Sequence, residues 1–196
     1  MSMPKRYDPR EAEARLQKSW AESGIFRYDP KGREPVFSID TPPPTVSGMI
    51  HMGHVFSYVQ AEVIARYRRM RGYRVFYPFC FDDNGLPSER FTEKVKGVKA
   101  AEMPRAEFVK LCLEVTAQAE EQFKDLWTRF GFSCDWSLLY TTIDPWVQRI
   151  SQRSFLDLVR RNRVYRRESP TLWCPECGTA VAQEAPGTDV SLIDTV

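Results

Sequence analysis

Both histidines of this 196-residue chain lie in one tetrapeptide, His51-Met-Gly-His54. The tetrapeptide joins a proline-rich stretch to a run of apolar residues at helical spacing, so it is expected at the start of a helix. A helix start has unpaired N–H groups and a positive dipole end, which favour phosphate. Two imidazoles there could donate to phosphate oxygens as charge develops, while Gly53 lets a ligand approach and Gly48 lets the loop turn. The alternative is that His51 caps the helix and His54 has no chemical role.

A second candidate site is a close cysteine pair, Cys174-Pro-Glu-Cys177-Gly. This spacing suits a metal better than a structural disulfide in a reducing compartment. Two thiolates do not complete a tetrahedral zinc site, and the sequence has no later Cys or His. A zinc knuckle and a reduced, metal-free turn therefore both stay open. The other cysteines, Cys80, Cys112 and Cys134, are expected to be buried free thiols.

Composition limits the class of protein without pointing to a ligand. Hydrophobic residues make up 42% and charged residues 28%, as in an ordinary folded domain. The net charge of +2 is the difference between 28 basic and 26 acidic residues, so it neither favours nor excludes nucleic-acid binding. No apolar run is long enough for a signal peptide or a membrane span, so a cytosolic location is expected.

Hydrophobic periodicity predicts the elements that position these residues. Helices are expected at about 7–23, 55–71, 105–130 and 145–162, and strands at 35–40 and 74–81. Strand, helix and strand in succession form a parallel α/β crossover, whose ligands bind beyond the carboxyl ends of the strands. Two polar segments with Gly and Pro, 41–54 and 82–90, are expected to converge there as loops.

Four segments in the same order resemble class I aminoacyl-tRNA synthetases. Residues 42–54 resemble the signature loop usually written HIGH, and residues 81–90 resemble the segment after the second strand in the valine, isoleucine and leucine subgroup. The Asp-Asp-Asn-Gly form of that segment favours the valine type. Residues 131–144 and 172–183 are also similar to valine-type members, so the resemblance covers about residues 7–183.

The resemblance implies the first half of a Rossmann-like nucleotide-binding fold. It also implies a site that activates valine with ATP, which would bind as its Mg complex. The implied ATP-binding residues are Ser47, Gly48, His51, Gly53 and His54. The two histidines would stabilise the transition state as the valine carboxylate attacks the α-phosphorus and pyrophosphate leaves. No side-chain nucleophile is needed, so catalysis would consist of positioning and electrostatics.

The implied amino-acid pocket is formed by Pro43, Pro44, Thr45 and Asp82. Asp82 would accept the α-ammonium group in a charge-assisted contact, unless it is simply a turn aspartate. By the same resemblance, Cys174 and Cys177 are metal ligands and tRNA is a partner of the parent enzyme. Cys80 stands where the family pattern has glycine, so its thiol either crowds the ligand site or is tolerated.

The resemblance also predicts how the chain is divided. Residues 1–34 would be a helix and lead-in, residues 35–168 the half-fold, and residues 169–196 the start of an inserted editing region. Family members are several times longer, and the 196 residues contain no lysine loop of the kind written KMSKS. We therefore expect weak or no adenylate formation by these residues alone. The incomplete sheet would have an open edge, through which a homodimer is expected.

Two other interpretations stay open at this stage. In one, the chain is a non-catalytic module that binds tRNA or another protein through the arginines between Arg160 and Arg167, although cations are also common at solvated helix ends. In the other, the fold is the same and the substrate is isoleucine, leucine or another small amino acid. The Asp82-Asp-Asn-Gly85 segment argues against this second alternative.

Overall fold

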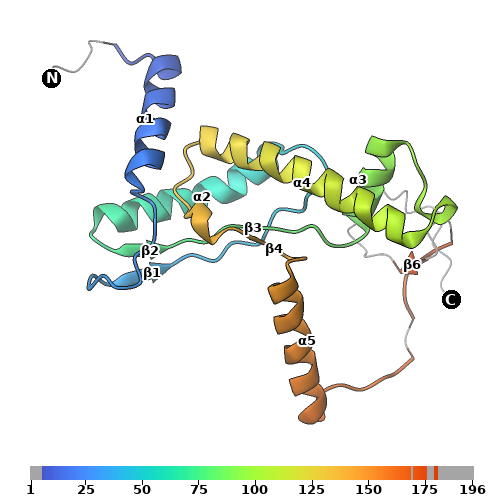
Figure 1. The fold of residues 1–196 in the computed structure, drawn as a ribbon. Helices are drawn as coiled ribbons and strands as arrows, with labels where there is room; N and C mark the ends of the chain where they lie inside the picture. Colours follow the sequence, from blue (N-terminus) through green and yellow to red (C-terminus); the bar gives the residue numbers. More distant parts are fainter. Residues whose placement is uncertain (1–5, 169, 176–178, 181–196) are drawn as a thin grey trace. The chain divides into compact units, whose positions relative to one another are not determined.

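The computed structural model describes residues 6–168, 170–175 and 179–180, in two compact units that divide the chain at 1–147 and 148–196 (Figure 1). The helices are α1 (Pro9–Ser23), α2 (Met52–Met70), α3 (Leu86–Lys96), α4 (Arg105–Arg129) and α5 (Pro145–Arg160), with short 3-10 turns at Ala100–Glu102 and Trp136–Leu138. The strands are β1 (Val36–Ser38), β2 (Arg74–Phe76), β3 (Cys80–Phe81), β4 (Tyr140–Thr141), β5 (Trp173–Cys174) and β6 (Thr179–Ala180). In the described part of the chain, no helix is both long and apolar enough to cross a membrane.

A parallel sheet organises the first unit. β1 pairs in parallel with β2, and β3 pairs in parallel with β4. Because β2 and β3 follow each other, the segment 74–82 runs through the middle, flanked by 36–46 and 134–142 (Figure 1). The single strand predicted at 74–81 is divided into β2 and β3. Pro78 lies in the gap, where its missing N–H removes a ladder bond.

The predicted crossover is confirmed, because β1 and β2 are parallel neighbours joined by α2. The helix begins at Met52, three residues earlier than predicted, since the His51 side chain caps its first turn. It ends before Gly72, whose φ of 80° is in the left-handed region that glycine tolerates best.

The core lies where α2 and α4 pack against the middle segment of the sheet. Tyr58 of α2, Phe79 and Trp127 of α4 form a ring cluster, with centroids 5.2 Å apart for Tyr58 and Trp127 and 5.8 Å apart for Tyr58 and Phe79. The indole of Trp127 is fully buried. The apolar stripe predicted for 105–130 is therefore a packing surface. This surface of α4 packs against both α2 and the middle segment of the sheet.

The prediction that residues 82–90 form a loop was wrong in its second half. α3 begins at Leu86, directly after Gly85, whose φ is 87°. Pro87 lies in the first turn, where a residue without an N–H is tolerated. Buried Ser88 and Thr92 then face the fold, and Ser88 Oγ donates to Val46 O at 3.3 Å. Only the turn 82–85 remains irregular.

The three dispersed cysteines are free thiols. Cys80 and Cys134 are buried, as predicted, and Cys112 is only half-buried. Cys80 lies opposite Tyr140 in the β3–β4 ladder, and burial raises the pKa of its thiol to about 11. The fold therefore accommodates a side chain at this position against β4.

Candidate functional site

The two histidines close the first turn of α2 by capping each other's backbone. His51 Nδ1 accepts from Gly53 N at 3.1 Å, and His54 Nδ1 accepts from His51 N at 3.4 Å. Their ring centroids are 4.1 Å apart. This is a capping box built from imidazoles instead of the usual hydroxyl and carboxylate.

The capping contacts decide which nitrogen of each ring carries a proton. A nitrogen that accepts from a backbone N–H has no proton of its own, so each neutral imidazole keeps its proton on Nε2. His54 is held in this form, since burial lowers its pKa and the neighbouring His51 lowers it further. Each ring is therefore an Nε2–H donor beside the positive end of a helix dipole. Capping and ligand binding thus use different atoms of the same ring and are compatible.

Gly53 is required by the position of the His51 ring. A Cβ at Gly53 would lie 2.9 Å from His51 Cε1 and 3.0 Å from His51 Nδ1, closer than unbonded carbon atoms approach. The missing side chain lets the imidazole fold over the start of the helix. The helix cap therefore explains why a glycine lies between the two histidines.

The two predicted loops meet at the sheet edge, as expected. Thr45 forms a parallel bridge with Asp82, Asp82 N donates to Pro44 O, and Val46 N donates to Asp82 O, both at 2.9 Å. Pro44 is buried, and Thr45 is half-buried. Pro43 is half-buried and Ser47 exposed in the adjoining loop; Gly48 follows them, three residues before the helix cap.

The carboxylate of Asp82 is fixed by a residue that sequence analysis missed. Thr142 Oγ1 donates to Asp82 Oδ1 at 3.0 Å and accepts from Asp83 N at 3.1 Å. Asn84 N donates to the same Oδ1 at 3.2 Å, which forms an Asx turn. Asp82 is therefore a turn aspartate, as the alternative interpretation proposed. The turn and the predicted ammonium contact are compatible, because a carboxylate has further lone pairs.

Asp83 is buried beside a second carboxyl group, that of Glu120 on α4. Glu120 and the side chain of Thr141 are the groups that can hydrogen-bond to the Asp83 carboxyl group, and both lower its pKa. Burial raises the pKa of Asp83 to about 6 and that of Glu120 to about 7. The charge of Asp144 raises both pKa values further, and the charge of Asp82 raises that of Asp83. One of the two carboxyl groups therefore keeps a proton that the other accepts.

The described half of the cysteine pair does not form a metal site by itself. Cys174 lies in β5, which pairs antiparallel with β6, and it is half-buried. Cys177 lies outside the described residues. Among the residues that the structure describes, no group of three or more His, Cys, Asp or Glu side chains could hold a metal ion. Zinc is therefore not established.

The arginine cluster at the end of α5 is exposed, and part of it is paired within the helix. Arg160 and Arg161 lie 3.8 Å and 3.3 Å from the carboxylate of Asp157. Such exposed pairs contribute little to stability. Nothing in these contacts favours the non-catalytic module over an ordinary solvated helix end.

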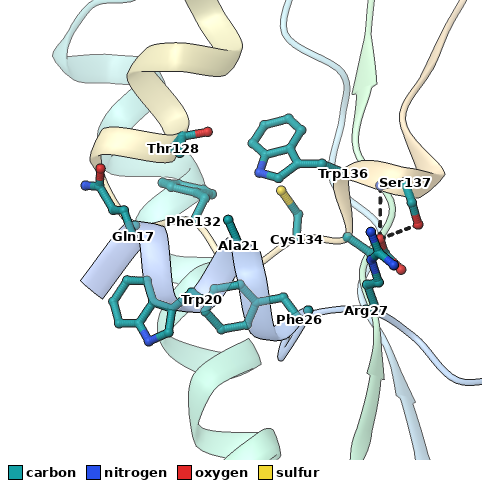
Figure 2. A pocket seen from close by; sticks show the side chains of 13 residues that line it. Gln17, Trp20, Ala21, Phe26, Arg27, Thr128, Phe132, Cys134, Trp136 and Ser137 are labelled. Carbon is teal, nitrogen blue, oxygen red and sulfur yellow. Dashed lines mark hydrogen bonds between the residues drawn. The ribbon is translucent and has the colours of Figure 1, made fainter. Parts of the chain in front are cut away.

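A hollow of about 210 Å³ lies between α1, the end of α4 and the loop before β4 (Figure 2). Its walls include the aromatic rings of Trp20, Phe26, Phe132 and Trp136. At one side Asp135 accepts from the N–H and hydroxyl of Ser137. None of the predicted site residues lines this hollow, so it is separate from the loops around Asp82 and the histidines.

Comparison with known proteins decides the family. The model of the family "tRNA synthetases class I (I, L, M and V)" matches residues 15–191, which is most of the chain. The chain belongs to this family. The class I tRNA synthetase fold expected from the motifs is thereby confirmed, as is the resemblance on which it was based.

Relatives of this synthetase chain include valine–tRNA ligases from distant organisms. The Rickettsia felis enzyme is 51% identical over 181 residues, which cover 92% of this chain and 21% of that enzyme. The Thermoplasma acidophilum enzyme is 48% identical over 176 residues, or 90% of this chain and 22% of that enzyme. The chain thus spans about a fifth of the length of these relatives.

A solved structure supports the same fold. It is the ternary complex of Agrobacterium radiobacter K84 agnB2 LeuRS with tRNA and LeuAMS. It matches with a TM-score of 0.75 and 30% identity, over 91% of this chain and 21% of that chain.

Proposed function

We propose that this chain forms the amino-terminal part of the valine-activating site of a valine–tRNA ligase. The reaction would join valine to the α-phosphate of ATP and release pyrophosphate, and tRNA would then accept the valyl group with release of AMP. The observation that carries the proposal is the parallel bridge between Thr45 and Asp82. It brings the loop that leads into the two histidines beside the carboxylate suited to an amino acid.

The phosphate side of the proposed site is the start of α2. The Nε2–H groups of His51 and His54 would donate to ATP phosphate oxygens, with the dipole of a 19-residue helix behind them. Because both rings are fixed by their Nδ1 caps, they need little reorganisation as charge builds up on the phosphates. Ser47, Gly48 and Gly53 would adjoin the nucleotide.

The amino-acid side of the proposed site is the edge formed by Pro43, Pro44, Thr45 and Asp82. The Asp82 carboxylate would accept the α-ammonium group, since its acceptor capacity exceeds the two bonds from Thr142 and Asn84. The prolines would give the pocket a rigid apolar wall that fits a small aliphatic side chain. Valine is favoured over leucine because the curated relatives of about 50% identity are valine–tRNA ligases.

A surface on α2 supports a role within a larger enzyme. Phe56, Val63 and Met70 are 72%, 62% and 79% exposed along one helix. Apolar patches of this kind mark contact surfaces. We infer that further chain of the type present in the longer relatives covers them. A homodimer through the open sheet edge has no support from the relatives and stays a prediction, which sedimentation velocity at several concentrations would test.

The test is calorimetric titration of the purified chain with a stable valyl-adenylate analogue and with its leucyl counterpart. We expect the valyl analogue to bind more tightly, and Asp82→Asn to weaken it at least tenfold through loss of the charge-assisted contact. A double variant, His51→Asn with His54→Gln, keeps side chains that can form a capping box but removes both imidazoles. It should fold and lose affinity for the analogue.

Two results would refute the assignment. One is equal binding of the analogue by the wild type and Asp82→Asn, and the other is tighter binding of the leucyl analogue. Valine-dependent ATP–pyrophosphate exchange is a second readout, in which we expect weak activity because these 196 residues contain no lysine loop.

Zinc at Cys174 and Cys177 stays a prediction. The two thiolates would supply half of a tetrahedral shell, so a further pair of ligands is required. Metal content of the purified chain, compared with that of a Cys174→Ser variant, tests it. Stoichiometric zinc that disappears in the variant is the expected result if the knuckle binds metal, and its absence from both would favour the reduced turn.

A further inference from the structure

Thr142 stands at the meeting point of two segments that are far apart in sequence. Its backbone N–H donates to Phe81 O at 3.0 Å, which continues the β3–β4 ladder by one residue. That ladder bond brings the Thr142 hydroxyl beside the turn that begins at Asp82. The two residues are 60 positions apart in sequence.

The hydroxyl of Thr142 has one proton, and its contacts determine where the proton points. Asp83 N donates to Thr142 Oγ1 at 3.1 Å, so the oxygen acts there as an acceptor. Asp82 Oδ1 can only accept, so the hydroxyl proton points to this oxygen across 3.0 Å. The hydroxyl therefore joins a backbone donor to a carboxylate acceptor in one chain of hydrogen bonds.

We propose that Thr142 is a positioning residue that holds the Asp82 carboxylate in the orientation in which it receives the α-ammonium group. This inference rests on the proposed function of Asp82. Oδ1 is the fixed oxygen, because both Thr142 and Asn84 donate to it. Oδ2 would then accept from the α-ammonium group of the ligand. Among the described residues, no hydrogen bond ends on Oδ2, in agreement with this division.

The hydroxyl, and not the size of the side chain, carries this role. Thr142→Val keeps the branched shape and removes the donor to Asp82 and the acceptor for Asp83 N. Thr142→Ser removes a methyl group and keeps both hydrogen bonds. The two variants therefore separate positioning from packing.

The Asn84 amide reports directly on the Asp82 carboxylate, because it donates to the same oxygen. We would measure amide–water exchange by NMR on the full chain, first without ligand. In Thr142→Val, the Asn84 and Asp83 amides should exchange roughly fivefold faster, the factor expected for one hydrogen bond of ordinary net strength. Both should stay at the wild-type rate in Thr142→Ser. The Val46 amide, which donates to the Asp82 backbone carbonyl, is the control and should not change.

Titration with L-valine in the presence of ATP gives the second readout. Affinity should fall about tenfold in Thr142→Val and be restored in Thr142→Ser, and Thr142→Val should have no further effect in an Asp82→Asn background. An unchanged Asn84 amide in Thr142→Val would overturn the proposal, whatever the affinities. If the Val46 amide accelerated equally, the role would be structural only. A wild type that does not bind valine would refute the function proposed for Asp82. The exchange rates of the Asp83 and Asn84 amides would still show whether Thr142 holds the Asp82 carboxylate.

Discussion

Replacing Glu120 by glutamine should change how the stability of the chain depends on pH. In the wild type, the raised pKa values of buried Asp83 and half-buried Glu120 imply that one carboxyl group holds a proton that the other accepts. Their folded pKa values of about 6 and about 7 lie above the ordinary values of 3.8 and 4.5. A raised folded pKa contributes stability that is complete below the unfolded value and is lost as the pH rises through the folded value. The loss should therefore occur between about pH 4 and pH 7.

The size of the effect follows from the shift at Asp83. A rise from 3.8 to about 6 corresponds to about 3 kcal/mol at about 1.36 kcal/mol per pKa unit. Glu120 is only half-buried, so solvent screening reduces this to about 1–2 kcal/mol. In Glu120→Gln, Asp83 stays buried, but the amide can donate to its ionised form, so this loss should become smaller.

The assay is urea unfolding of the wild type and Glu120→Gln at pH 5 and pH 8. We expect the free energy of unfolding of the wild type to fall more than that of the variant between these values, by up to about 1–2 kcal/mol. The titration of His54, whose lowered pKa gives the opposite trend, cancels in the difference because both proteins contain it. Asp82, Glu121 and Asp144 also remain in both. Parallel pH profiles for the two proteins would refute the shared proton.

Three further substitutions test the fold and the helix start. Trp127→Ala removes a fully buried indole and should lower the free energy of unfolding by about 3–5 kcal/mol in urea denaturation. Gly53→Ala would place a Cβ 2.9 Å from His51 Cε1, so we expect it to displace the ring and weaken adenylate-analogue binding in calorimetry. Asp8→Ala removes the cap that accepts from Arg10 N at 3.0 Å and should cost about 1 kcal/mol by the same denaturation assay.

Matched variants make these three outcomes decisive. Phe130→Ala, at a ring that is 48% exposed, should cost much less than Trp127→Ala, and equal losses would contradict the packing argument. Met52 is next to Gly53 and its side chain is exposed, so Met52→Ala should leave analogue binding unchanged. Asp8→Asn keeps a capping oxygen, so a loss as large as that of Asp8→Ala would show that the cap bond is not what stabilises α1.

The sequence by itself determined the elements whose signals are local. The apolar stripe of α4 could be predicted because apolar residues at helical spacing indicate one buried face. The end of the helix could be predicted from Gly131, whose φ is 75°. The histidine tetrapeptide was readable because two rare side chains coincide with a helix start. The convergence of two loops followed from the parallel crossover rule, and the Thr45–Asp82 bridge confirms it.

Only the tertiary structure decided the contacts that join distant segments. Thr142 lies after a two-residue strand, too short to show a period, and only the bond of its N–H to Phe81 O places it beside Asp82. Glu120 appears in sequence as an ordinary helix carboxylate, and its proton is shared only because α4 packs against the Asp83 turn. α3 was missed because Gly85 and Pro87 indicate a turn until the burial of Ser88 and Thr92 is known. Hydrogen bonds between remote residues depend on packing, which no local pattern specifies.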